Sequence, residues 1–257
     1  MENLNGIPRL REIVARLRAP NGCPWDREQT HSSLRALLVE ECHEVIDAIE
    51  RSDDANLREE LGDLLLHVVM HAQMAEERGA FDLEHVAAEI CEKMIRRHPH
   101  VFGDSAASNS EEVLQQWEAI KRKEKGADAG ALDGVATSMP ALLRAQTLQK
   151  KAARVGFDWP DVEPVFAKLE EETAEIREAV SGNDPAAIEA EIGDLLFSAV
   201  NLARKLGVDA ETALAGANKR FATRFRRIEE TLRAEGRRIE DTPLVELDQI
   251  WEQAKRE

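Results

Sequence analysis

The sequence lacks several features that mark particular classes of protein. It has no Tyr, and aromatic residues make up only 4% of its 257 residues. No apolar run approaches the roughly 20 residues that span a bilayer, so we expect no membrane segment. The three cysteines, Cys23, Cys42 and Cys91, show no CxxC spacing, and we find no signal-peptide pattern. We therefore expect a reduced, cytoplasmic protein.

Basic residues are outnumbered by acidic ones. The chain has 34 Lys and Arg against 50 Asp and Glu, which gives a formal net charge of −16. Such a charge opposes sequence-independent binding to DNA or RNA, so we expect no nucleic-acid partner. A small polyanion can still be held through bound metal ions, and the acidity therefore does not exclude nucleotides.

Proline and glycine are scarce inside the segments with helical hydrophobic periodicity, which predicts an all-α protein. The stretch GADAGALDGVATSMP at 126–140 breaks this pattern and is predicted to be a linker between an N-terminal module, 1–125, and a C-terminal module, 141–257. The periodicity predicts helices at 7–18, 30–51, 56–78, 82–97, 109–125, 141–154, 162–181, 185–206, 209–235 and 243–256. Pro185 suits the first turn of its helix, and His98-Pro-His100 is predicted to be a helix-terminating turn.

The two modules carry the same acidic pattern. Residues 40–49, EECHEVIDAI, correspond to 171–180, EETAEIREAV, at a spacing of 131 positions. Residues 60–69, ELGDLLLHVV, correspond at the same spacing to 191–200, EIGDLLFSAV. Each module also ends on Trp-Glu-x-x-Lys, at 117–121 and at 251–255. The chain is therefore predicted to be a duplicated helical-bundle module.

The acidic side chains of each copy are spaced three or four residues apart on two successive helices, so they are predicted to converge between antiparallel neighbours. Bare carboxylates that lie this close repel one another and attract a cation. Ligands that are all oxygen favour Mg²⁺, with Mn²⁺ as a substitute. The candidate metal-binding and catalytic residues are Glu171, Glu172, Glu175, Glu191 and Asp194. The second candidate site is Glu40, Glu41, Glu44, Glu60 and Asp63.

Two other interpretations of these motifs remain open. A single EExxE on a helix is usually a solvated face, although its recurrence at a fixed spacing argues against coincidence. Glu40-x-x-His43 also matches the ExxH motif of carboxylate-bridged di-iron bundles, but the second copy has Ala174 in place of the histidine. A non-catalytic regulatory module that binds nucleotide and metal is a further alternative.

The C-terminal module has the better set of residues for binding a substrate. Asn201 follows Asp194 by seven residues on the same helix face, whereas the corresponding residue of the first copy is Met70. An amide can hydrogen-bond a sugar or phosphate, and guanidinium groups suit a phosphate chain. The candidate substrate-binding residues are Asn201, Arg220, Arg224, Trp251 and Lys255.

EExxE followed by ExxD on adjacent helices resembles the all-α nucleoside triphosphate pyrophosphohydrolase superfamily. Together with GCPWD at 22–26, RRHPHVF at 96–102, LQKKAARVGFDW at 148–159 and NLARKLG at 201–207, it resembles the MazG family over essentially the whole chain. The resemblance implies Mg²⁺-dependent hydrolysis of nucleoside and deoxynucleoside triphosphates to monophosphate and pyrophosphate. It also implies a homodimer, catalysis mainly in the C-terminal module, and metal binding by the five acids of the second copy.

Overall fold

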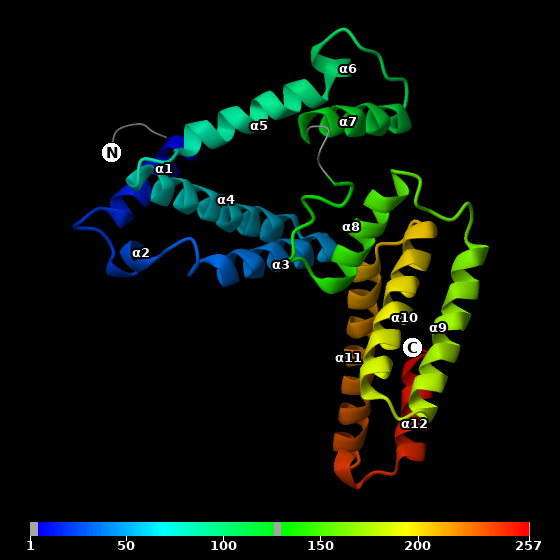
Figure 1. Cartoon of the computed structure of the whole chain (residues 1–257). Coiled ribbons are helices and arrows are strands. Elements are labelled where there is room, and N and C mark those ends of the chain that lie inside the picture. The colour runs from blue at the N-terminus through cyan, green and yellow to red at the C-terminus, as the bar shows by residue number, and fades with distance from the viewer. Residues whose placement is uncertain (1–4, 126–129, 257) are drawn as a thin grey trace. The chain divides into compact units, whose positions relative to one another are not determined.

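A computed structural model of the chain describes residues 5–125 and 130–256. Within these residues the secondary structure is helical without a strand, which confirms the all-α prediction (Figure 1). The contacts divide the chain into two compact units, unit 1 at Met1–Ala127 and unit 2 at Asp128–Glu257, and each is described by itself. No helix of the described ranges is long and apolar enough to cross a membrane.

Unit 1 agrees with the predicted helices except near three short segments. The predicted helix at 30–51 begins only at Arg35, because the hydroxyls of Thr30 and Ser33 each accept a hydrogen bond from the backbone N–H of the other residue and hold a turn. Two short helices were not predicted, and both begin at a proline. The second begins at Pro99, inside the turn predicted at 98–100, and the preceding helix ends at Arg97, as that turn requires. The helices of unit 1 are α1 (Ile7–Arg18), α2 (Pro24–Glu28), α3 (Arg35–Arg51), α4 (Asp54–Glu77), α5 (Leu83–Arg97), α6 (Pro99–Phe102) and α7 (Ser110–Lys125).

Unit 2 follows the predicted helices to within two residues at each end, with one short 3-10 helix, η1, in addition. Of the predicted linker 126–140, residues 126–129 lie outside the described residues. Residues 130–140 belong to unit 2, where Leu132 lines a cleft. The helices of unit 2 are α8 (Ala141–Ala153), α9 (Glu163–Ser181), α10 (Pro185–Lys205), α11 (Ala210–Ala234), η1 (Ile239–Asp241) and α12 (Leu244–Ala254).

Each unit contains an antiparallel pair of acidic helices joined by a short turn, α3 with α4 and α9 with α10 (Figure 1). The two turns are built alike. Ser52 and Asn183, which correspond in the repeat, both have a left-handed backbone with φ of 53° and 51°. The next residues, Asp53 and Asp184, cap the second helix through their side chains. The duplication therefore extends to the backbone of the turn.

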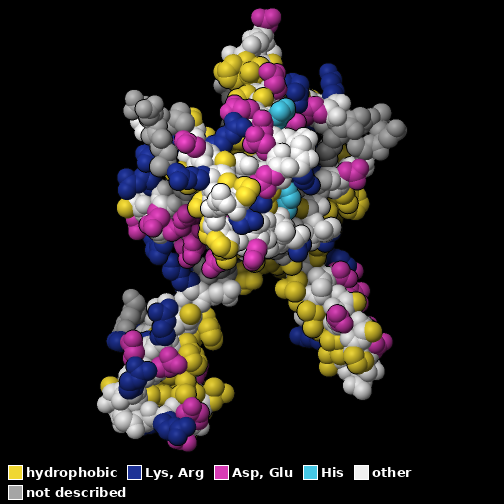
Figure 2. Space-filling model, turned by 90° about the vertical axis from the view of Figure 1, so that its left-hand side faces the viewer, with side chains coloured by type: hydrophobic (Ala, Val, Ile, Leu, Met, Phe, Trp, Pro, Cys, Tyr) yellow, Lys and Arg dark blue, Asp and Glu magenta, His cyan; other side chains and the backbone are white. Residues whose placement is uncertain are grey.

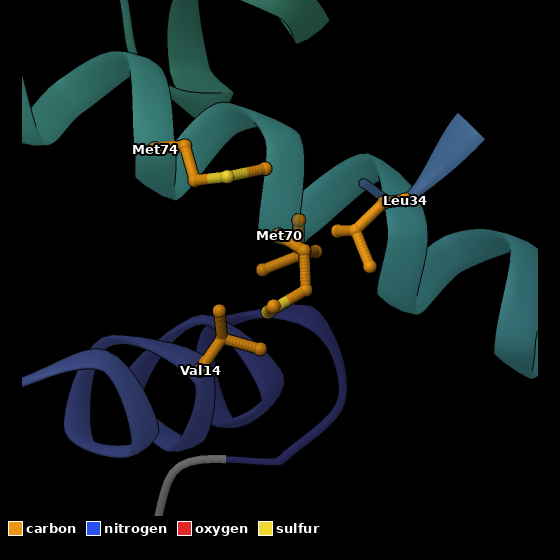
Figure 3. Packing of buried hydrophobic residues seen from close by; sticks show 5 residues of the cluster. Val14, Leu34, Met70 and Met74 are labelled. Atoms are coloured by element: carbon orange, nitrogen blue, oxygen red, sulfur yellow. The ribbon is translucent and has the colours of Figure 1, made fainter. Parts of the chain in front are cut away.

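The core of unit 1 lies between α1 and α4, with Leu34, the residue just before α3, packed against them (Figure 3). Val14 from α1 is 0% exposed, and it packs in one cluster with Leu34, Met70 and Met74. Met70 is 4% exposed. The apolar side chain at this position thus serves packing in unit 1.

In unit 2, helix α8 packs on α10 and α11. Gln146 on α8 is 3% exposed and bridges the turn between these two helices, because its Nε2 donates to the Val208 carbonyl at 2.8 Å while its Oε1 accepts from the Ala210 N–H at 3.0 Å. Val165, Val200 and Leu232 are buried in the same unit. Buried polar groups that are fully paired in this way contribute to a rigid scaffold.

Many large apolar side chains nevertheless remain exposed, and Figure 2 shows them in yellow among acidic and basic side chains. On α10 they include Ile192, Leu196 and Phe197, which are 44%, 54% and 44% exposed. Single exposed apolar residues are ordinary on a protein surface, but several on one helix indicate a surface that another element or molecule can cover.

Candidate active site

Three of the predicted acids of unit 2 form a cluster. Oxygens of Glu172, Glu175 and Glu191 all lie within 4.8 Å of one another. The first two stand one turn apart on α9, and the third comes from α10, so the antiparallel pairing of these helices brings the carboxylates together. Such a group of oxygens suits a divalent metal ion.

Glu172 is the most buried member of the cluster, with only 2% of its surface exposed. Its Oε1 lies 2.8 Å from Nζ of Lys168, one turn earlier on α9. Its Oε2 is buried and has no hydrogen-bond partner among the described residues. A buried carboxylate oxygen without a partner is costly, and a bound cation would satisfy it.

The charges of the cluster also act on one another. Partial burial raises the pKa of Glu175 above its usual value, and the neighbouring carboxylates Glu191 and Glu172 raise it further. Hydrogen bonds to Glu172 and Glu171 raise the pKa of Lys168, so this lysine stays charged. One ammonium therefore faces several carboxylates, which leaves an excess of negative charge that a cation would offset.

The other two predicted acids of unit 2 lie outside this three-carboxylate group. Glu171 has a side chain 56% exposed, and its Oε1 accepts a hydrogen bond from Lys168 at 3.0 Å. Asp194, one turn after Glu191 on α10, lines the same cleft as Glu172. The structure therefore places Asp194 in the wall of this cleft and leaves Glu171 largely exposed on α9.

The cleft in unit 2 has a volume of about 750 Å³, within the range of small-molecule sites. It is walled by α8, α9, α10 and the loop 156–159. Its charged lining residues are Asp158, Lys168, Glu172, Asp194 and Arg204. Its apolar lining residues are Leu132, Leu148, Ala152, Phe157, Trp159 and Phe197. The cavity thus joins the carboxylates to an apolar and partly aromatic wall.

The predicted residue Asn201 lines this cleft and is 7% exposed. Its Oδ1 accepts two hydrogen bonds from Arg204, at 2.9 Å from Nε and 2.7 Å from Nη2. Arg204 also forms an ion pair with Asp158 at 2.5 Å, and this guanidinium lowers the pKa of Asp158. The ion pair holds the loop that carries Phe157 and Trp159 against α10.

The four remaining predicted substrate-binding residues lie elsewhere in unit 2. Arg220 and Arg224 are on α11, Trp251 is on α12, and Lys255 directly follows α12. The guanidinium of Arg224 lies over the Trp251 ring, 5.7 Å from its centroid, and unit 1 repeats this contact with Arg97 over Trp117 at 5.6 Å. None of Arg220, Arg224, Trp251 and Lys255 lines the cleft described above.

Several residues of the cleft were absent from the sequence prediction. Lys168, Gln149, Asp158 and Arg204 all line it. The available signal was their position in LQKKAARVGFDW and NLARKLG, and for Lys168 its position one turn before Glu172. The contacts of Gln149 with Phe197 and of Asp158 with Arg204 span 48 and 46 residues of sequence, and helical periodicity does not predict them.

Unit 1 also holds a carboxylate cluster, formed by Glu41, Glu60 and Asp63 within 4.8 Å. Burial and the nearby Asp63 raise the pKa of Glu41, and burial with the nearby Glu60 raises the pKa of Glu44. Glu60 also accepts a hydrogen bond from Asn56 at 2.5 Å. Glu40 lies on an exposed part of α3 and outside this group.

The surroundings of the two clusters differ. Lys168 and Asn201 of unit 2 correspond in the repeat to Leu37 and Met70. In unit 1, Met70 belongs to the hydrophobic core and Leu37 is partly buried and packs against it. His43 is exposed and belongs to neither group of possible metal ligands found among the described residues. The geometry therefore gives no support to the di-iron interpretation.

Comparison with known proteins agrees with this arrangement. The family model for the MazG nucleotide pyrophosphohydrolase domain matches the chain twice, at 29–102 and 161–228. The two matches contain the two acidic helix pairs, so the chain belongs to the MazG nucleotide pyrophosphohydrolase family.

The curated relatives include nucleoside triphosphate pyrophosphohydrolase of Escherichia coli K12, 50% identical over 99% of this chain and 98% of its own length. Nucleoside triphosphate pyrophosphohydrolase/pyrophosphatase MazG of Thermotoga maritima is 50% identical over 95% of this chain and 93% of its own length. A nucleoside triphosphate pyrophosphohydrolase of Mycobacterium tuberculosis is 43% identical over 52% of this chain and 41% of its own length. The first two relatives therefore cover both units.

Proposed function

We propose that unit 2 hydrolyses nucleoside and deoxynucleoside triphosphates to the monophosphate and pyrophosphate, with Mg²⁺ as its cofactor and Mn²⁺ as a substitute. The observation that carries this proposal is Glu172, a buried carboxylate that belongs both to the cluster with Glu175 and Glu191 and to the wall of the cleft. The names of the full-length relatives support the reaction class.

The residues present fit a hard divalent cation. Glu172, Glu175 and Glu191 supply carboxylate oxygens within reach of one ion, and the unpartnered Oε2 of Glu172 is available to it. Asp194, which lines the cleft on α10, would be a further ligand of this ion. Glu171 would contribute indirectly, by holding Lys168 through their hydrogen bond. When bound, Mg²⁺ would supply charge neutralisation for the phosphates and a lowered pKa for a coordinated water.

The reaction attaches the oxygen of water to the α-phosphorus and breaks the bond from that phosphorus to the α,β-bridging oxygen. Pyrophosphate leaves, and one carboxylate of the cluster accepts the proton of the attacking water. Lys168 lies one turn from Glu172 and remains charged, so it is placed to offset charge on the phosphate chain. The aromatic wall with Phe157 and Trp159 would receive the nucleoside.

Unit 1 fits the non-catalytic alternative better. It keeps a carboxylate cluster, but Leu37 and Met70 stand where unit 2 has Lys168 and Asn201. Because apolar side chains that pack in or against the core occupy these positions, we propose that unit 1 binds a divalent ion at most and contributes mainly to stability or assembly.

Product analysis tests the reaction. The protein would be incubated with a mixture of ribo- and deoxyribonucleoside triphosphates and Mg²⁺, and the products separated by ion-exchange chromatography. We expect monophosphate and pyrophosphate in equal amounts, and no turnover after chelation of the metal. Diphosphate with orthophosphate would overturn the position of cleavage.

We further propose a homodimer in which the exposed apolar face of α10 is covered, and binding of the phosphate chain by Arg220, Arg224, Trp251 and Lys255. Light scattering after size exclusion tests the dimer, and a monomer at micromolar concentration would contradict it.

A mixture of the inactive variants Glu172→Gln and Arg224→Gln tests whether the basic residues and the carboxylates of one active site come from the same chain. Recovery of about a quarter of the wild-type activity, from one intact site in half of randomly mixed dimers, would mean that the partner supplies them. No recovery would mean that they act within their own chain.

A further inference from the structure

Two buried glutamines on α8 differ in one respect that matters for the cleft. Gln146 has both ends of its amide paired with the backbone, and it does not line the cleft. Gln149, one turn later, lines the cleft and is 7% exposed. Its Nε2 donates to the carbonyl of Phe197 at 2.8 Å, but its Oε1 is buried and has no partner among the described residues. Gln149 therefore presents a fixed acceptor that nothing in the described part of the chain satisfies.

The oxygen and nitrogen of the Gln149 amide cannot exchange places without loss of a hydrogen bond. Rotation by half a turn would place Oε1 against the Phe197 carbonyl, oxygen facing oxygen, and would lose the 2.8 Å hydrogen bond. The backbone of α10 thus determines which end of Gln149 is free, and the free end is an acceptor. A buried acceptor left unpaired is costly, so its presence in a cavity wall points to a donor on the ligand.

Asn201 provides the complementary group on the same wall. It follows Phe197, the anchor of Gln149, by one turn of α10, which is about 6 Å along the helix axis. Because Arg204 donates twice to its Oδ1, its Nδ2 is left as the donor. The cleft wall therefore offers one fixed acceptor and one fixed donor beside the aromatic rings of Phe197 and Trp159.

We infer that Gln149 is a specificity-determining residue that accepts a hydrogen bond from a neutral donor on the nucleoside, while Asn201 donates to an acceptor on that same moiety. This inference rests on the proposed function, since it concerns the nucleoside end of that substrate. Two groups of a nucleotide have this chemistry, a sugar hydroxyl and a base edge with N–H beside C=O. Arg204 and Asp158 are positioning residues: Arg204 donates to Asn201 and so orients its amide, and Asp158 holds Arg204 through the ion pair.

The experiment compares thymidine triphosphate with its 3′-deoxy analogue and with its N3-methyl analogue, each on the wild type and on Gln149→Met. For one of the two analogues, we expect the wild type to lose about 10- to 100-fold in kcat/KM, the consequence of leaving a buried acceptor unpaired. Gln149→Met should lose a similar factor on the parent nucleotide and should not discriminate further against that analogue. If the variant no longer discriminates against the 3′-deoxy analogue, the partner of Gln149 is the sugar hydroxyl. If it no longer discriminates against the N3-methyl analogue, the partner is the base N–H.

Gln146→Met is the matched control, since it removes a buried amide of α8 that does not line the cleft. It should lower activity on all three nucleotides by the same factor. A wild type that uses both analogues as well as the parent nucleotide would overturn the inference, as would an equal loss on all three in Gln149→Met. The wild-type comparison decides the question even where a variant fails to fold.

Binding constants for the same three nucleotides, measured by calorimetry with Ca²⁺ in place of Mg²⁺, separate this inference from the proposed reaction. Discrimination in binding without any turnover in Mg²⁺ would leave the Gln149 subsite standing and refute the hydrolysis. Turnover in Mg²⁺ together with equal binding and equal kcat/KM for all three would refute the subsite alone.

Discussion

Replacing Glu172 by Gln tests whether catalysis depends on the buried carboxylate of unit 2. The change keeps the shape of the side chain and removes its charge. Lys168 keeps its contact with Glu171 at 3.0 Å, so we expect the helical circular dichroism to remain unchanged. Glu172 is 2% exposed, and its Oε2 is buried without a hydrogen-bond partner in the part of the chain that the structure describes, so this carboxylate has the most to contribute to a bound cation.

We expect this variant to lose about 10²- to 10³-fold in kcat, the usual effect of removing one preorganised electrostatic group, equivalent to about 2.7–4 kcal/mol of transition-state stabilisation. The matched control is Glu41→Gln, which makes the same change at the corresponding position of unit 1. Its activity should stay within about twofold of the wild type, because Glu41 belongs to unit 1, for which no catalytic role is proposed.

The control also has a stability readout. Because burial and Asp63 raise the pKa of Glu41, the folded unit favours the protonated form of this carboxyl. A neutral Gln should therefore leave the thermal midpoint unchanged or raise it. Steady-state release of pyrophosphate, with Mg²⁺-dependent thermal shifts measured in parallel, provides the assay. Equal losses of activity in both variants with the fold intact would show two working sites and refute the reasoning.

Three further predictions concern stability. Met70→Asn should destabilise unit 1 by about 2–5 kcal/mol in urea unfolding, since it puts an amide into a core position that is 4% exposed; a loss below 1 kcal/mol would contradict the packing described. Asp184→Ala should cost about 1 kcal/mol, because it removes the cap that accepts from two backbone N–H groups of α10 at 3.1 and 3.2 Å, and Asp184→Asn should retain most of it. Burial and the neighbouring rings of His31 and His67 lower the pKa of His71 below 6.5, so the unfolded chain binds the proton more readily and stability should fall as the pH drops below 6.5. His71→Gln should flatten this slope of the urea midpoint between pH 7.5 and 5.5, and an unchanged slope would count against the buried neutral imidazole.

Much of the fold could be predicted because it depends on local spacing. The helices of unit 2 end within two residues of the predicted ends, since apolar periodicity and caps such as Asp184 are local signals. The turn at Thr30 and Ser33 was not predicted. The apolar periodicity continues through it, but side-chain hydrogen bonds to the backbone stabilise a turn there in place of a helix.

Local sequence patterns were sufficient to predict the all-α class, the duplication and the convergence of acids between the two helices of each pair. Such patterns suffice because helical periodicity and a short turn bring Glu172 and Glu191 together. Which of these carboxylates is buried with an unpartnered oxygen depends on the packing of whole helices. The same holds for the contacts of Gln149 with Phe197 and of Asp158 with Arg204, which lie 48 and 46 residues apart in sequence. Such contacts depend on how α8, the loop 156–159 and α10 pack, and no local spacing specifies that packing.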